Sequence, residues 1–367
     1  MSEWTLRVCS YTGTVEGEIR NASDRSFSFA LNRMTTGSFK IPLNHPRAAT
    51  LLQGDCLVQL FQDKTLRVNM EVVSVEEVAD DTSAGSLMVT VADAAYWRLT
   101  HRLVGTSGPG EVIGTAGSPV SKHTIVMLIL QSLNSDGDTG VRQGPGASVG
   151  STYVAWRFKP FTECLLELSR TLSGYDFKFD HYHPFGDMGG GITPVASTAI
   201  ANLKTEPALG TTRPNTIFEY GTGRRNIKAY KRQVSREGLM TRGWSLPPGF
   251  PETTEAVISA ESLSAVTARG IHEAVLSSEI SGVAARAELL REHLAVRKQP
   301  RQLITFTPAE NGQYKFNTDY EIGDIVTGRA KTRNGIRFNA LFRVYGVEVK
   351  LSAEGMASYE LALVPED

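Results

Sequence analysis

The sequence predicts a mixed, β-rich α+β protein in which two similar small β-barrels flank a middle α/β insertion. Three observations lead to this prediction. The chain has 367 residues, 41% hydrophobic and 21% charged, which is ordinary for a soluble globular protein and enough for two or three domains. Short runs with strand alternation are concentrated near both ends, whereas helical patterns are more frequent between them. A β pattern near the N-terminus also recurs near the C-terminus.

These observations divide the chain into three regions. We predict an N-terminal barrel over residues 1–105, a middle α+β domain over residues 106–213 and a C-terminal region over residues 214–367. The C-terminal region contains the second barrel, residues 299–367, and a helix before it, residues 279–298.

The first hundred residues have the spacing of short strands in a small barrel or sandwich. Four segments alternate polar and apolar residues or form short apolar runs, and turn-like segments separate them. The predicted strands are Ser26–Leu31, Cys56–Phe61, Val68–Val75 and Leu87–Val91. A brief helix is predicted over Arg47–Leu52, after a turn that opens at Pro42.

The middle region begins with a loop and a helix. Residues 105–122 are rich in Gly, Ser, Thr and Pro, which marks a boundary. The helix that follows should have Ser121 as its N-cap and end near Asn134.

A second helix and a strand are predicted later in this region. The helix should open at Pro160–Glu163, with Thr162 capping its exposed amides, and end at Gly174, which can adopt the left-handed conformation. The alternation of Tyr175–Phe179 predicts a strand, and His181–Thr193 is loop-like.

The C-terminal region combines strands with one helix. Thr216–Tyr220 and Ile227–Val234 have strand patterns, and prolines after Leu246 break the chain. Residues 279–298 place their apolar side chains on one stripe of a helix, which Pro300 ends. Short strands follow to the C-terminus.

The most informative feature is a resemblance between the two ends. Gly54 and Asp55 open a strand near the N-terminus, and Gly323 and Asp324 open one near the C-terminus. In both places two further strand segments follow at nearly equal spacing. Either the chain carries a duplicated barrel or the two β segments are unrelated, and the shared three-strand register favours duplication.

The four residues of this pattern are interpreted as turn residues. Glycine permits a tight turn at the start of a strand, and the aspartate can accept hydrogen bonds from nearby backbone amides. Two equivalent barrels in one chain can imitate a higher symmetry, because three copies would present six barrels. Closed rings are built from head-to-tail contacts whose rotation closes, so such a trimer could cap a six-fold tube.

Composition excludes several classes of function. The 38 basic and 39 acidic residues give a formal charge of −1, without the basic excess of a dedicated nucleic-acid-binding protein. The three cysteines are unpaired in spacing, as in a protein that folds in a reducing cytoplasm. The N-terminus does not resemble a signal peptide, and the longest apolar stretch, Ile125–Leu130, is too short for a bilayer, so no stable membrane insertion is expected.

No residue pattern indicates catalysis, a metal or a cofactor. The chain lacks the usual zinc-protease, serine-hydrolase and phosphate-loop motifs. Cys164 has apolar neighbours at helical spacing, which favours a buried core thiol, and Glu163 and Glu167 fit a solvated helix face. The nearest approach to a metal cluster lies in a Pro- and Gly-rich loop that gives no tetrahedral frame: Asp180, His181, His183 and Asp187.

Several segments, taken in order, resemble the minor tail proteins of siphophages. Each pattern by itself is degenerate, and the specific feature is the order in which the segments follow one another along the chain. The likeness covers about the first 105 and the last 90 residues, with a looser match between them. It is carried by Leu31–Pro42, His45–Pro46, Leu51–Val58, Asp93–Leu99, Arg102–Val104, Tyr320–Val326 and Arg343–Val347.

This resemblance implies a structural virion protein similar to the baseplate hub of contractile-tailed phages. Such a protein is a homotrimer with two tail-tube-like barrels per chain, located at the tail tip after assembly in the host cytoplasm. Its partners would be the distal tail or tail tube ring, the tape measure protein, and tip fibre or spike proteins. DNA would pass through its lumen without being gripped, which agrees with the near-neutral charge.

Two other classes of function remain open at this point. A carbohydrate-binding or adhesion module of the tail tip would expose aromatic side chains on a β surface, for example around Trp156 or Tyr182. A tail-associated cell-wall hydrolase would need a carboxylate pair or a Cys/His pair converging in a cleft.

Overall fold

The computed structural model describes most of the chain. Asp55, His183 and Asp187 lie outside the described residues. The described residues are 3–10, 14–54, 56–78, 85–106, 111–114, 118–148, 150–152, 154–170, 174–182, 199–221, 226–247, 250–252, 254, 256–277, 283–309, 314–332, 335–352 and 356–366.

Strands from the two ends of the chain form one continuous sheet of 13 strands. The N-terminal strand group consists of β1 (Trp4–Ser10), β2 (Val15–Ile19), β3 (Ser23–Ala30), β4 (Thr36–Pro42), β5 (Cys56–Gln62), β6 (Thr65–Val78) and β7 (Ser86–Asp93), with α1 (Ala48–Gln53) before β5. The C-terminal strand group consists of β17 (Thr212–Gly221), β18 (Ile227–Ser235), β22 (Arg301–Pro308), β23 (Ile325–Thr332), β24 (Gly335–Leu351) and β25 (Ala357–Pro365). All strands predicted from the N-terminal sequence are confirmed, as are the brief helix and the strands at β17 and β18; β1, β2 and β4 were not predicted.

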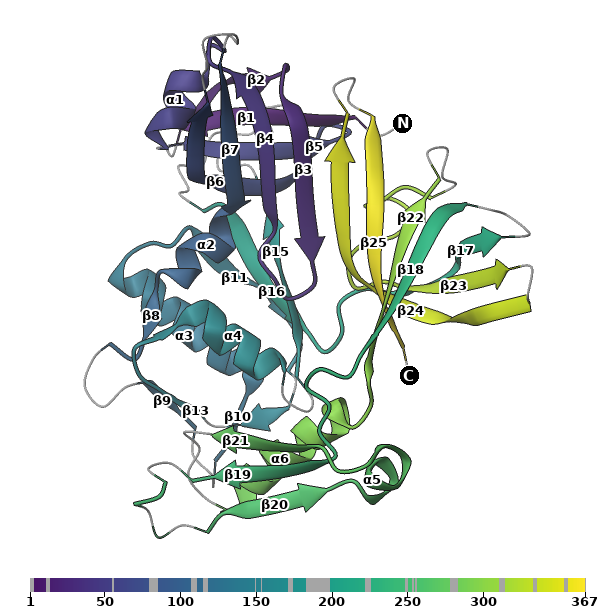
Figure 1. Cartoon of the computed structure of the whole chain (residues 1–367). Coiled ribbons are helices and arrows are strands. Elements are labelled where there is room, and N and C mark those ends of the chain that lie inside the picture. Colours follow the sequence, from purple (N-terminus) through teal and green to yellow (C-terminus); the bar gives the residue numbers. More distant parts are fainter. Residues whose placement is uncertain are drawn as a thin grey trace.

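The sheet curls and is almost entirely antiparallel, which confirms the β-rich class. Its order is β2-β1-β5-β6-β7-β4-β3-β24-β25-β22-β18. β23 pairs with the first part of β24, on the same edge as β3, and β17 is parallel to β23. The N-terminal and C-terminal groups meet where β3 pairs with β24 (Figure 1). We call this contact the joint.

The two strand groups have the same order both in the sheet and along the chain. The order β3-β4-β7-β6-β5-β1 corresponds to β18-β22-β25-β24-β23-β17. A bulge shifts the β6–β7 register between Val72 and Ser74, and another shifts the β24–β25 register between Val344 and Gly346, the same place in the repeated sequence pattern. The last pair differs, because β1 is antiparallel to β5 whereas β17 is parallel to β23. The groups therefore match in topology and in the place of a β-bulge. Such bulges are specific features of a fold rather than random defects.

One hydrophobic core runs through both strand groups. It contains Phe27 and Phe39 from the N-terminal group and Phe306 and Phe342 from the C-terminal group. Because successive side chains of a strand point to opposite faces, these apolar side chains all lie on the inner face of the curled sheet. The core crosses the joint, so the two groups are stabilised together.

The middle region has a second core of its own. A small sheet of order β11-β16-β15 and the helices α2, α3 and α4 supply most of it. Its elements are α2 (Ala94–Thr100), β8 (Leu103–Val104), β9 (Glu111–Ile113), β10 (Val120–Ser121), α3 (Lys122–Asp136), β11 (Val141–Gly146), β12 (Ser151–Thr152), β13 (Val154–Trp156), β14 (Lys159–Pro160), α4 (Phe161–Ser169), β15 (Asp176–His181) and β16 (Ala201–Glu206).

The two predicted helices of this region exist, but two details predicted for the second helix are wrong. Ser121 caps α3, because its hydroxyl accepts a hydrogen bond from the amide of Thr124 at 3.1 Å. Thr162 does not cap α4; it is buried inside the first turn, and its hydroxyl donates to Thr100 on α2 at 3.2 Å. The helix also ends at Ser169 rather than Gly174, since the amide of Arg170 closes a tight turn onto the preceding carbonyls.

A further small unit is inserted between β18 and β22. It consists of β19 (Arg242–Leu246), β20 (Ile258–Glu261), α5 (Leu263–Arg269), β21 (Glu273–Ser277) and α6 (Val283–Arg297). α6 packs on the three-stranded sheet at the foot of the molecule in Figure 1, where the buried guanidinium of Arg286 donates to the carbonyls of Ser245 and Ala256 at 3.3 and 2.9 Å. α6 confirms the helix predicted within residues 279–298.

A search of the described residues finds no helix with the length and apolar character needed to cross a bilayer.

Candidate functional site at the joint of the strand groups

The joint is built from apolar side chains of β24 and β3. β24 extends beyond the part that pairs with β23, and this extension pairs with β3 from Gly346 opposite Ala30 to Leu351 opposite Arg25. Val349 lies opposite Phe27, and both side chains are 0% exposed. The pairing thus continues the sheet and the core from one group into the other.

The segment before Gly323 covers one end of the joint. The ring of Phe316 packs 5.6 Å from the ring of Phe29 on β3. The buried amide of Gln62 donates to the Phe316 carbonyl at 2.9 Å and accepts from Asn317 at 2.8 Å. These contacts fasten the C-terminal group to β5 as well as to β3.

The glycines of the two Gly-Asp pairs occupy two different turns. Gly323 has φ 93° and Gly54, which ends α1, has φ 75°, so both have left-handed backbone. Asp324 is 1% exposed and accepts hydrogen bonds from the amides of Thr211 at 2.7 Å and Glu321 at 2.9 Å.

Asp324 also accepts from the guanidinium of Arg213 at 2.8 Å. It therefore joins the start of β23 to the chain entering β17. Asp55, which follows Gly54 in the N-terminal Gly-Asp pair, lies outside the described residues.

A partly buried ion pair ties the middle region to both strand groups. Asp176, at the start of β15, accepts from the side chain of Asn32 at 2.8 Å and from the amide of Leu209 at 2.9 Å. Arg343 on β24 forms an ion pair with the same carboxylate and donates to the Leu209 carbonyl at 2.8 Å. One carboxylate thus links the N-terminal group, the middle region and the C-terminal group.

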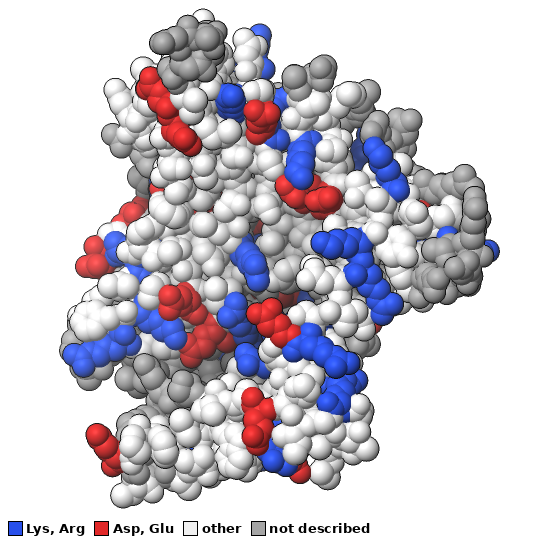
Figure 2. All heavy atoms as spheres, viewed as in Figure 1, with Lys and Arg blue, Asp and Glu red and all other residues white. Residues whose placement is uncertain are grey.

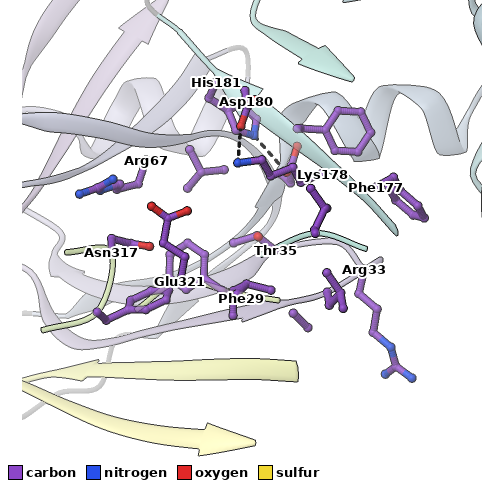
Figure 3. A pocket seen from close by; sticks show the side chains of 18 of the residues that line it. Phe29, Arg33, Thr35, Arg67, Phe177, Lys178, Asp180, His181, Asn317 and Glu321 are labelled. Atoms are coloured by element: carbon purple, nitrogen blue, oxygen red, sulfur yellow. Dashed lines mark hydrogen bonds and ion pairs between the residues drawn. The ribbon is translucent and has the colours of Figure 1, made fainter. Parts of the chain in front are cut away.

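Beside this network lies a cavity of about 250 Å³, shown in Figure 3. Its walls come from β3, β6, β15 and the segment around Phe316, so all three parts of the molecule contribute. Charged and polar side chains of both signs line it, among them Arg67, Lys178, Asp180, His181, Asn317 and Glu321.

The groups around this cavity are held by structural contacts. The side chain of His181 is 2% exposed and hydrogen-bonds Asp93 at 3.1 Å. Asp93 also caps α2 by accepting from the amide of Tyr96 at 3.0 Å. Lys178 pairs with Asp180 at 2.9 Å, and burial lowers the pKa of Arg67. Within the described ranges, no three His, Cys, Asp or Glu side chains converge in a way that could hold a metal ion.

The other chemically suggestive residues are inert or ion-paired. Burial raises the pKa of the Cys164 thiol to about 12 and that of Cys9 to about 11, so neither forms a thiolate near neutral pH. Glu167 forms an ion pair with Lys159. Trp156, a candidate for an exposed glycan platform, is 4% exposed and belongs to the middle core.

Surface charge is mixed over the face in Figure 2, where Lys and Arg alternate with Asp and Glu, and a short run of basic side chains lies over β18. Such interspersed charge does not form a phosphate-binding track.

Sequence reasoning missed the three residues that tie the regions together. Asn32, Asp176 and Arg343 lie far apart in the chain: Asn32 in the turn between β3 and β4, Asp176 at the start of β15 and Arg343 within β24. The only local signal was the position of Asp176 at the start of a predicted strand.

Comparison with solved structures identifies the fold. No protein-family model matches the chain, and a comparison with curated proteins finds no match. The chain is similar to a tail protein from Neisseria meningitidis, with 13% identity, a TM-score of 0.59 and coverage of 100% of this chain and 97% of the other. It is also similar to the 43 kDa tail protein of prophage MuSo2 from Shewanella oneidensis, with 9% identity, a TM-score of 0.63 and coverage of 99% and 98%.

A third similar structure is the prophage tail protein gp18 from Listeria monocytogenes, with 10% identity, a TM-score of 0.57 and coverage of 99% and 94%. The matches span these proteins almost from end to end. The chain therefore has the fold of phage tail proteins, as the resemblance of its sequence segments to phage tail and baseplate hub proteins implied.

Proposed function

We propose that the chain is the ring-forming hub at the tip of a phage tail, a structural component of the virion. Three copies would form a ring that caps the six-fold tail tube and surrounds the path of the tape measure protein and, later, of the DNA. The full-length likeness to phage tail proteins supports a role in a tail.

The observation that carries the ring is the match between the two strand groups. Their common strand order and the bulges at Val72–Ser74 and Val344–Gly346 support two equivalent barrels in one chain. In this proposal the N-terminal barrel is residues 1–105, and the second barrel, residues 299–367, also takes β17 and β18. Gly54 and Asp55 are then equivalent to Gly323 and Asp324. A trimer of such chains presents six barrels and can mate with a six-fold tube.

The proposed mechanism is mechanical rather than catalytic. The hub would close the tube, hold tip fibre or spike proteins on its outer side, and open a passage when the host is engaged. A formal charge of −1 suits a conduit through which DNA slides, because phosphate binding grows with the number of basic contacts.

The mass of the purified protein in solution tests this proposal. Light scattering coupled to size-exclusion chromatography should give a trimer, and class averages from electron microscopy should show a ring with six similar lobes. A particle that stays monomeric at high micromolar concentration, or a ring of another order, would contradict the hub.

A further inference from the structure

Each strand of the joint has a counterpart with an open edge. In the matched order of the two groups, β6 corresponds to β24 and β18 corresponds to β3. In the described part of the chain, the end of β6, Ser74–Val78, pairs only with β7, whereas the corresponding end of β24 pairs with both β25 and β3. Over the same described ranges, β18 pairs only with β22. Unpaired edges present amide and carbonyl groups that can pair with another chain.

We propose that the end of β6 in one copy pairs with β18 of the next copy, antiparallel, in the way that β24 pairs with β3 within the chain. This inference rests on the proposed ring, since the occupant of each edge is a second copy of the same protein. In a trimer, contacts between copies would alternate with joints inside copies, so that the sheet continues around the ring.

The register of this contact follows from the hydrogen-bonded ladders on either side of it. One rung of the N-terminal group contains Ser74, Thr90, Ser38 and Ser26. The corresponding rung of the C-terminal group contains Gly346, Ala362, Thr305 and Lys231. Ala30 follows Ser26 by the same number of residues as Ser235 follows Lys231, and Ala30 lies opposite Gly346 across the joint. The contact therefore places Ser74 opposite Ser235, Val75 opposite Val234 and Glu77 opposite Arg232.

The charges at these positions are complementary. Glu77 lies opposite Leu87 and Arg232 opposite Ile304, so both point to the face of the sheet that carries the core, yet both are exposed. Their counterparts at the joint are Val349 and Phe27, which are fully buried. An ion pair between copies would thus replace an apolar pair within the chain.

There is a physical reason for an ion pair between copies where the joint within the chain has an apolar pair. Apolar side chains at an open edge invite aggregation, whereas charged ones keep the edge soluble until a partner of opposite charge arrives. The same charges would disfavour pairing of two like edges, because two acidic ends of β6 or two basic β18 strands would then lie side by side. They therefore favour head-to-tail closure.

Exposed apolar side chains on both edges also fit a surface that a second copy covers. Val234 is 54% exposed, whereas its counterpart Phe29 packs against the rings of Trp4 and Phe316. Val78 is 49% exposed at the end of β6. Pairing would cover both valines and bring the basic side chains over β18 in Figure 2 close to the acidic end of β6.

Disulfide trapping tests the register. The variant Val75→Cys with Val234→Cys should form, on mild oxidation, covalent dimers and trimers that reduction reverses. The native cysteines do not interfere, because Cys9, Cys56 and Cys164 are at most 1% exposed. The matched control is Val75→Cys with Gln233→Cys, whose thiols lie on opposite faces of the sheet and should give far less product. Equal yields from the two pairs would overturn the register.

Charge reversal tests the ion pair. Glu77→Arg should raise the concentration needed for half assembly by tenfold or more, because like charges then face each other. Combining it with Arg232→Glu should restore assembly, and Glu252→Arg, an equal charge change at an exposed residue of the insertion, should leave assembly unchanged. Melting curves check that each variant folds.

The outcomes separate this inference from the hub itself. A trimeric protein in which the Cys pair does not cross-link and the double reversal does not rescue overturns the β6–β18 contact and leaves the hub standing. A protein that is monomeric and does not cross-link overturns both.

Discussion

The turns at Gly54 and Gly323 have the same place in the strand order but very different surroundings. An added Cβ at Gly54 would meet nothing within 4 Å, whereas one at Gly323 would meet the carbonyl oxygen of Leu209 at 2.5 Å. The first turn faces open space, and the second is pressed against the chain that leaves the middle region. The two groups therefore differ at this turn: the C-terminal turn contacts the segment that follows the middle region, and the N-terminal turn is uncovered.

The largest expected effect comes from removing the anchor. Arg343→Met leaves the buried Asp176 carboxylate without its cation. Because the pair is only partly buried, the cost should be about 3 kcal/mol of unfolding free energy, the low end of the range for buried pairs. Urea denaturation measures it. The matched control is Arg329→Met. The guanidinium of Arg329 donates to the exposed side chain of Asn339 on the neighbouring strand, so this substitution should cost below about 0.5 kcal/mol of unfolding free energy. Equal costs would mean that the network does not anchor the middle region.

Gly323→Ala should have the next largest effect. The substitution adds a side chain to a left-handed residue and drives it into a backbone oxygen that cannot move aside alone, so about 2–3 kcal/mol should be lost. The loss should show as a lower melting temperature of the whole molecule, because the core is continuous across the joint. A loss below about 1 kcal/mol would contradict the close approach to Leu209.

Gly54→Ala should cost less, about 1 kcal/mol. It has the same backbone penalty at the end of α1 but meets no neighbour. Measured under identical conditions, the difference between the two alanine variants isolates the contribution of the neighbouring chain. If Gly54→Ala were the more harmful change, the contrast between the turns would be reversed.

The smallest expected effect is a pH dependence in the middle region. Burial lowers the pKa of His123 below its ordinary value of 6.5, and its ring hydrogen-bonds Thr205 at 2.6 Å. The unfolded chain then binds the proton more readily than the folded one, so the stabilisation is present above pH 6.5 and is lost as the pH falls through the lowered pKa. His123→Gln should lose less stability than the parent between neutral and mildly acidic pH, as urea midpoints at two pH values would show. A steeper loss of stability in the variant than in the parent would contradict the inferred direction of this pH dependence.

Local pattern predicted the strands whose side chains alternate and whose ends are marked by turn residues. β3 and β7 alternate in burial along most of their length, which is a period that a single sequence displays, whereas β5 is buried at every position and its short apolar run predicted it. β1 was missed although burial alternates along Trp4–Ser10, so its sequence did carry a readable strand pattern. The failed cap at Thr162 has a tertiary origin, since its hydroxyl hydrogen-bonds Thr100 on another helix, a partner that no local rule includes.

The sequence by itself determined the β-rich class and the similar strand patterns near its two ends, and it carried segments that resemble those of phage tail proteins. The class and the strand patterns follow from the alternation of side chains, which acts within a few residues. Only the tertiary structure decided that the two ends share one sheet and one core, that Asp176 and Arg343 link three regions, and that β6 and β18 keep open edges. Those features depend on pairs of residues far apart in the chain, and their energies exist only once the chain has brought the partners together.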